Sequence, residues 1–265
     1  MLTMLLAVSV AAGSAKPEPA KTEPLKVTPP HPVITEVLYA VPTGDGGDAN
    51  KDGSRNAAGD EFIELVNPHD KPISLKGYKI TDKSLGKAGA LVFIFPECEL
   101  KPGAVVVIFN GFEANVPGAC GDTAKAPAGS NEKFSGAIVF SIKVTSNRLG
   151  FSNTSDCVVL SSPDGKAVEI VKWGAISETL PECPLVEDAP TTNKASVTRR
   201  GMTKGFVVHD TLGGNAIFSP GKFDVKVTTS APTDEKKDEP KPADKTPTKP
   251  DPKKPADTKP KAPKP

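Results

Sequence analysis

Between residues 33 and 224 the chain is a series of short apolar runs bounded by turn residues, and no long stretch repeats apolar residues at helical spacing. Such runs are typical of strands. Chain reversals such as Lys101-Pro102-Gly103 and Pro163-Asp164-Gly165 separate them. The pattern predicts an all-β fold, an antiparallel β-sandwich. The expected strands are residues 33–39, 61–67, 78–81, 91–95, 104–109, 137–144, 157–161 and 167–173.

Both ends of the chain differ in composition from this central domain. Residues 1–15, MLTMLLAVSVAAGSA, are apolar and finish in small residues, which predicts a signal peptide cleaved after Ala15. No Lys or Arg precedes Lys16, so retention as an anchor stays open, although the run is too short for an ordinary membrane span. Residues 16–32 are rich in proline and predict an extended linker. Residues 225–265, rich in Lys and Pro, predict a disordered tail, either a solubilising spacer or a contact with an anionic polymer.

Four cysteines agree with export to the medium, the cell surface or a periplasm. None belongs to a CxxC pair, and an even number of cysteines in an exported protein indicates disulfides. Of the three connectivities we favour Cys98 with Cys120 and Cys157 with Cys183, because each pair closes a loop that lacks a strong core pattern. Each bridge would add about 3 kcal/mol of stability. Four free or buried thiols are the alternative.

The loop Asp48-Ala49-Asn50-Lys51-Asp52-Gly53 reproduces the first half of a calcium loop. Oxygen ligands stand at positions one, three and five, and a glycine stands at position six. Position twelve is Gly59 where a bidentate Glu is expected, although Asp60 follows it directly. We therefore predict Ca²⁺ as the candidate ion, with Asp48, Asn50, Asp52 and Asp60 as its ligands. A solvated, glycine-rich connection is the alternative.

The sequence contains few residues arranged in patterns that are typical of catalytic sites. The sequence has no GxSxG, HExxH or GxxxxGK[ST] motif. Of the three histidines, only His209, beside Asp210, is placed to join a site through folding. Glu61 and Glu64 are three residues apart on an expected strand, so they face opposite sides of the sheet and cannot form a glycosidase pair.

The charge pattern gives a weak case for nucleic-acid binding. The formal net charge is +1, so the whole chain has no field that recruits a polyanion. Lys194, Arg199, Arg200 and Lys204 form a modest basic cluster that phosphates would accept. A strand edge protected by charge explains the same residues. Trp173, the single tryptophan, is expected to be a core anchor rather than a surface stacking platform.

Several of these segments together follow the order of a known family. They are Ile34-Thr35-Glu36-Val37, DEFIELVN at 60–67, ISLKGYKITD at 73–82, Leu100-Lys101-Pro102-Gly103, the hairpin at 160–174 and Ser219-Pro220-Gly221. In this order they resemble the lamin-tail domain in its bacterial exported form, over residues 33–224. The resemblance implies an immunoglobulin-like sandwich. In bacteria such domains often accompany secreted nucleases, phosphoesterases or surface proteins. Residues 111–134 and 177–194 stand as insertions relative to a minimal domain.

These observations lead to two hypotheses. The first is an exported, non-enzymatic structural or binding module that contacts a protein or a cell-envelope polymer and is braced by calcium and disulfides. The second is a secreted metal-dependent phosphoesterase or nuclease-associated protein in which carboxylates of the loop from Asp45 to Glu61, which we call the acidic loop, hold a catalytic metal. The second hypothesis requires a histidine or a further carboxylate that the fold brings to the loop, and His209 near Asp52 or Asp60 would support it.

Overall fold

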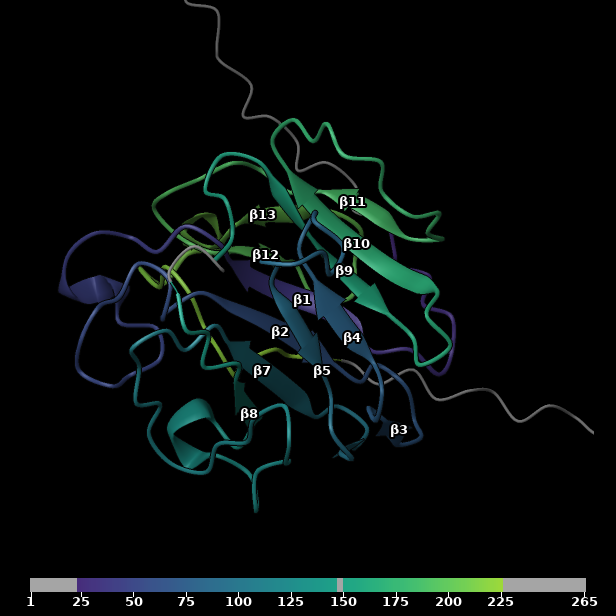
Figure 1. Ribbon diagram of the computed structural model, residues 1–265, viewed down its shortest axis with the longest axis horizontal. Helices are drawn as coiled ribbons and strands as arrows, with labels where there is room; N and C mark the ends of the chain where they lie inside the picture. Colours follow the sequence, from purple (N-terminus) through teal and green to yellow (C-terminus); the bar gives the residue numbers. More distant parts are fainter. Residues whose placement is uncertain (1–22, 147–149, 226–265) are drawn as a thin grey trace, which may run out of the picture. The chain divides into compact units, whose positions relative to one another are not determined.

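The computed structural model describes residues 23–146 and 150–225, and two β-sheets make up the frame of this part of the chain (Figure 1). The six-stranded sheet contains, in spatial order, β13 (Phe206–Val208), β12 (Val197–Arg199), β1 (Val33–Leu38), β2 (Phe62–Val66), β7 (Val105–Phe109) and β8 (Ile138–Ser141). The five-stranded sheet contains β11 (Val186–Asp188), β10 (Ala167–Trp173), β9 (Asp156–Ser161), β4 (Lys79–Thr81) and β5 (Val92–Ile94). A small pair joins β3 (Ile73–Ser74) to β6 (Glu99–Leu100). The short 3₁₀ helices include η1 (Asp45–Gly47), η2 (Glu132–Phe134) and η4 (His209–Leu212).

The predicted all-β sandwich is confirmed, and each of the eight expected strands is present with its ends shifted by at most three residues. Two strand pairs differ from the prediction because they are parallel: β7 with β8, and β10 with β11. A parallel pair requires a long crossover connection. The connections here, residues 110–137 and 174–185, contain the whole of the first expected insertion (111–134) and the first half of the second (177–194). The insertions thus add a parallel edge strand to each sheet.

Five short strands were not expected from the sequence: β3, β6, β11, β12 and β13. Each is two or three residues long, too short to show an alternation of apolar and polar residues. The most consequential of them is β12, because it pairs with β1 inside the six-stranded sheet. The sheet is therefore completed by residues that follow the β9–β10 hairpin in the chain.

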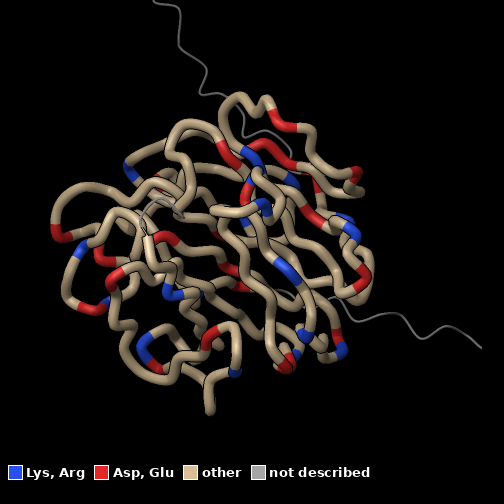
Figure 2. Tube along the Cα trace, in the orientation of Figure 1, with Lys and Arg blue, Asp and Glu red and all other residues tan. Residues whose placement is uncertain are grey.

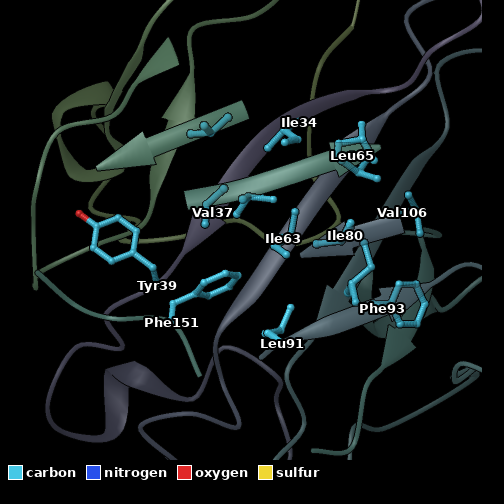
Figure 3. Close-up of a cluster of buried hydrophobic side chains, with 14 of the residues drawn as sticks. Ile34, Val37, Tyr39, Ile63, Leu65, Ile80, Leu91, Phe93, Val106 and Phe151 are labelled. Atoms are coloured by element: carbon cyan, nitrogen blue, oxygen red, sulfur yellow. The ribbon is translucent and has the colours of Figure 1, made fainter. Parts of the chain in front are cut away.

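The main core lies between the two sheets. Its side chains include Ile34, Ile63 and Val106 of the six-stranded sheet and Ile80 and Phe93 of the five-stranded sheet, and all are buried (Figure 3). Packing residues from both sheets into one cluster is what joins the layers of a sandwich.

The expected core role of Trp173 is confirmed. Its side chain is 1% exposed and stacks on Tyr39 with ring centres 4.1 Å apart. Its indole N–H donates to the carbonyl of Ser152 at 2.8 Å. Tyr39 in turn donates to the carbonyl of Pro190 at 2.8 Å, so the stacked pair ties β1 and β10 to the chain after β11.

A second core covers the outer face of the six-stranded sheet. It contains Leu38, Phe62, Val66, Val107 and Phe109, and loops cover these side chains. The covering residues come from several parts of the chain: Leu25, Val27, Val41, Ala49, Val116, Cys120, Phe134, Met202, Phe218, Phe223 and Val225. Because this sheet is buried on both faces, every residue of β1, β2 and β7 is buried.

The expected linker at 16–32 is described from residue 23 onwards, and this part contacts the domain. The N–H of Leu25 donates to the carbonyl of Met202 at 3.1 Å. His31 Nδ1 lies 2.7 Å from the hydroxyl of Tyr78, and His69 Nε2 lies 2.9 Å from the carbonyl of His31. Residues 23–32, the described part of the expected linker, therefore form a segment that is bound to the domain.

Other parts of the predicted domain organisation lie outside the described residues. These parts are the signal peptide at 1–15, the linker at 16–22 and the tail beyond Val225. Within the described residues, no helix has the length and apolar character needed to cross a membrane.

Candidate functional site

The acidic loop forms a turn in which side-chain oxygens accept hydrogen bonds from backbone N–H groups. Asp48 and Asn50 both accept from the N–H of Asp52, at 3.2 and 2.9 Å. Asp60 joins the two halves of the loop, because its two oxygens accept from the N–H of Asn50 at 2.8 Å and of Asn56 at 2.6 Å. The alternating oxygen donors of the sequence thus form the sharp turn that a calcium loop requires.

The two cations within this loop have partners other than its acids. Lys51 Nζ lies 4.6 Å from the centre of the Phe134 ring, over the covering insertion. Arg55 donates through Nε to the carbonyl of Pro42 at 2.8 Å. Neither cation forms an ion pair with Asp48, Asp52 or Asp60 among the described residues.

Asp60 is the most perturbed acid of the loop. Burial, with a smaller contribution from the negative charges of Asp48 and Asp52, raises its pKa to about 6. Over the ranges 23–146 and 150–225, no three His, Cys, Asp or Glu side chains are arranged to hold a metal ion. The loop therefore brings its candidate ligands into one turn without a preformed cage.

A second polar cluster lies in the middle of the six-stranded sheet. The register of β1 on β2 pairs Ile34 with Leu65 and then Glu36 with Glu64, so Thr35 is the extra residue of a β-bulge. The bulge turns Glu36 to the outer face, directly opposite Glu64. The two side chains are 1% and 0% exposed. Two carboxyl groups thus lie side by side in a buried place.

Residues 219–225, which we call the strap, cover this pair of carboxyl groups. The N–H of Ser219 donates to Glu36 at 2.9 Å, and the N–H of Gly221 donates to Glu64 at 2.8 Å. The Ser219 hydroxyl also donates to Glu36 at 2.8 Å, and the Ser196 hydroxyl donates to the same residue at 2.5 Å. The strap is thus bound to β1 and β2 through the two carboxyl groups.

Burial controls the protonation of the pair. Burial first, and then the charge of the neighbouring Glu36, raise the pKa of Glu64 to about 8. Burial likewise raises the pKa of Glu36, while its bond from Ser196 and the nearby His209 act in the opposite direction. The favoured state at neutral pH is a pair that shares one negative charge.

His209 belongs to this cluster rather than to the acidic loop. Its Nε2 lies 2.9 Å from Ser219 Oγ and 3.9 Å from a Glu36 oxygen, and its Nδ1 lies 3.0 Å from the carbonyl of Ala216. The expected neighbour Asp210 is exposed and takes no part in these contacts. The hydroxyl of Ser219 donates to Glu36, so it is engaged in holding the strap. Among the hydrogen bonds and ion pairs of the described residues, His209 has no contact with Asp52 or Asp60, so this support for a metallohydrolase is missing.

The expected basic cluster is divided by the fold. Arg199 is 2% exposed and forms ion pairs with Glu169 and Glu187, so it cannot reach a phosphate. Lys204 pairs with Glu23 at 3.0 Å. Lys194 and Arg200 remain exposed. Acidic and basic residues are interspersed along the trace of the domain (Figure 2), which agrees with the near-neutral net charge.

The expected disulfides are not formed in the structure, where all four cysteines are free thiols. Cys98 packs against the core between the sheets, whereas Cys120 packs against the core on the outer face of the six-stranded sheet. The six-stranded sheet separates these two cores, which explains why Cys98 and Cys120 do not meet. Cys157 belongs to a small third cluster, and Cys183 packs against the same cluster as a separate thiol.

Sequence reasoning missed the paired carboxyl groups, although a signal was present. Glu36 and Glu64 each interrupt an otherwise apolar strand, VITEVL and FIELV. A charged residue in such a run indicates either an exposed face or a buried polar partner. The pairing itself depends on the bulge at Thr35, which no pattern in the sequence marks.

Comparison with known proteins agrees with this architecture. The family model described as Lamin Tail Domain matches residues 28–175. The match therefore covers more than half of the chain, from the bound segment before β1 to just after β10. No curated protein matches the chain. Strands β11, β12 and β13, η4 and the strap follow the matched residues.

Proposed function

Because the chain belongs to the lamin tail domain family, a family of immunoglobulin-like sandwiches that serve as structural or binding modules, we propose that it is an exported, non-enzymatic module that contacts a protein or a cell-envelope polymer. One observation carries the proposal. The buried polar groups that are chemically suited to a site, Glu36, Glu64, His209 and Arg199, have their partners within the protein and hold its layers and segments together.

The contact surface that we propose is the free edge of the five-stranded sheet. Strand β5 is the last strand on its side of that sheet, and Ile94 on it is 49% exposed. An unpaired edge offers backbone N–H and C=O groups to an extended partner, and a large exposed apolar side chain adds contact area. Lys79, opposite Ile94 on β4, gives the neighbouring position a positive charge.

Binding is tested by retaining cell-envelope fractions on the immobilised full-length protein. Ile94→Lys is expected to abolish retention, whereas Leu212→Lys, at a side chain of similar exposure (44%) on η4, is the matched control. Equal retention by both variants would move the contact away from β5. Export is tested separately, by fusing residues 1–32 to a reporter enzyme that is active only outside the cytoplasm. A silent reporter would argue against an exported module.

Calcium is proposed as a brace of the acidic loop. The supporting observations are the preformed turn at Asp48, Asn50 and Asp52 and the position of Asp60 across it. An ion bound there would offset the mutual repulsion of the acids and rigidify the loop against the insertion, since the N–H of Asn115 donates to Asp52 at 2.9 Å. An activity screen against phosphomonoesters and phosphodiesters with Ca²⁺, Mg²⁺ or Mn²⁺ tests the alternative function. Hydrolysis that disappears in Asp48→Ala and Asp52→Ala would support a metal-dependent phosphoesterase instead.

A further inference from the structure

The polar attachments of the strap to the sheet converge on the carboxyl pair, while its Phe223 and Val225 side chains pack against the core on the outer face. Its N–H groups at Ser219 and Gly221 bind Glu36 and Glu64. A cavity of about 620 Å³ lies between the strap and the starts of β7 and β8, and another of about 630 Å³ lies between the strap and the segment from β12 to η4. Lys222, Phe223 and Asp224 line both cavities. The carboxyl pair is therefore the principal polar attachment of this segment.

When the strap is closed, protonation of one of the two carboxyl groups is favoured. Glu36 and Glu64 lie directly opposite each other under the strap, and two buried negative charges at that separation repel strongly. The Thr35 hydroxyl lies 2.7 Å from Glu64 Oε1, and because a hydroxyl can donate or accept, it can accept a hydrogen bond from Glu64 when that carboxyl group is protonated. Opening the strap would admit water to the pair and remove the need for this proton.

One charged side chain faces the pair directly, and three others lie on elements near the strap. His209 of η4 faces Glu36 at 3.9 Å. Arg199 of β12 lines the same cavity as His209, but it is committed to two other carboxylates. Lys222 of the strap and Lys51 of the acidic loop are close enough for their charges to interact. Among the ion pairs of the described residues, none involves Glu64, so no cation lies within ion-pair distance of it in the closed state.

We propose that the strap is a pH-operated latch, closed while Glu36 and Glu64 share one proton and released when both are ionised. The closed state holds the proton on the pair, and the open state gives it up to solvent. Release would expose the outer face of the six-stranded sheet around Val66 and Val105, which the strap and its neighbours cover. The latch would thus couple the pH of the surroundings to access to an apolar sheet face.

Proton linkage fixes the sign of the effect. Burial in the closed state raises the pKa of Glu64 from 4.5 to about 8, and an open strap would return it towards 4.5. Because the closed state then binds more protons than the open state between these two values, opening increases with pH by up to about tenfold per pH unit across that window. Below pH 4.5 and above pH 8 the contribution of Glu64 becomes constant.

The latch is tested by hydrogen–deuterium exchange of the full chain at pH 5.5, 7.0 and 8.5, with the rates corrected for the pH dependence of chemical exchange. The strap amides are expected to exchange faster than those of β7 at every pH. Their protection should fall by up to about tenfold per pH unit up to pH 8. Strap protection that is independent of pH, or strap amides that exchange only together with β7, would overturn the proposal.

Two variants assign the effect to the pair. Glu64→Gln mimics the protonated side chain, since its amide can accept from Gly221 and donate to Thr35, and it should keep the strap protected at pH 8.5. Glu132→Gln, at an exposed glutamate of η2, is the matched control and should retain the wild-type pH dependence. If Glu64→Gln does not fold, Glu36→Gln decides. It removes the neighbouring charge that raises the pKa of Glu64, so the fall in protection should move to lower pH. A pH dependence left unchanged by these substitutions would contradict the latch.

Discussion

Replacing Arg199 by methionine should destabilise the domain more than any neighbouring surface change. The guanidinium is completely buried and joins three parts of the sandwich. Nη2 pairs with Glu169 of β10 at 2.6 Å, Nη1 pairs with Glu187 of β11, and Nε donates to the carbonyl of Ile34 in β1 at 2.7 Å. The guanidinium also lies over the ring of Phe206, 4.4 Å from its centre. Methionine keeps apolar bulk in this place but leaves two carboxylates buried without their cation.

The expected cost follows from those two carboxylates. Removing one partner of a buried ion pair typically costs about 3–5 kcal/mol, because the remaining charge stays buried. That is a large part of the roughly 5–15 kcal/mol by which a domain is stable. Burial already raises the pKa of Glu169 to about 7, and Arg199 is the largest influence that lowers it. Without the arginine this pKa rises further. Each unit of that rise corresponds to about 1.4 kcal/mol of lost stabilisation of the ionised carboxylate.

This rise makes the cost depend on pH. A carboxyl group whose pKa is higher in the folded state than in the unfolded state stabilises the fold below the unfolded pKa, and the stabilisation is lost as the pH rises through the folded pKa. In the variant that window extends above pH 7. The variant should therefore lose more stability between pH 5.5 and pH 8 than the wild type does.

Urea unfolding followed by the fluorescence of Trp173, the only tryptophan and 1% exposed, measures the effect at both pH values. Arg200→Met is the matched control, since Arg200 is exposed and a surface change should cost within about 0.5 kcal/mol. A cost for Arg199→Met below about 1 kcal/mol at pH 8, or a cost that does not differ between the two pH values, would refute the reasoning.

Three further outcomes are expected. Excess Ca²⁺ should raise the thermal midpoint of the full chain relative to chelator, and Asp48→Ala with Asp52→Ala should remove the difference; no shift in the wild type would argue against the calcium brace. A chain ending at residue 175, where the family match stops, lacks β12 and the strap and should show no cooperative unfolding transition by circular dichroism, whereas a cooperative transition would show that the later strands are dispensable. Peptide mapping of non-reduced protein should find no bridge between Cys98 and Cys120, because they lie against different cores; finding that bridge would contradict the placement of the two loops.

The long strands of the fold could be predicted from the sequence, whereas the short strands that complete the six-stranded sheet could not. β1, β2, β7, β9 and β10 are five to seven residues long and consist largely of apolar residues, so their composition indicates strands. β12 has three residues, Val-Thr-Arg, and its strand conformation depends on pairing with β1 on one side and β13 on the other. Such pairing is a long-range property that a local pattern does not contain.

The same division holds for the candidate sites. The acidic loop was predictable because its oxygen donors alternate along a continuous segment and act on backbone groups a few residues away. The Glu36–Glu64 pair joins two strands to a strap more than 150 residues later in the chain. Arg199 illustrates the opposite error, since adjacency to Arg200 suggested a basic surface while strand alternation turns one of the two side chains inward.

These buried charges explain how a lamin tail domain sandwich is extended beyond the residues that its family model covers. Glu36, Glu64 and Glu169 lie within the matched part, and their partners Ser219, Gly221 and Arg199 lie beyond it. A buried carboxylate without such partners would be costly, so the matched part depends on the later segments for its polar groups as well as for strand pairing. The carboxyl groups also make that dependence sensitive to pH, because burial in the folded protein raises the pKa of each, although its partners act in the opposite direction. The segments after residue 175 are therefore part of the fold, and the strap is the part whose attachment can be reversed without unfolding either sheet.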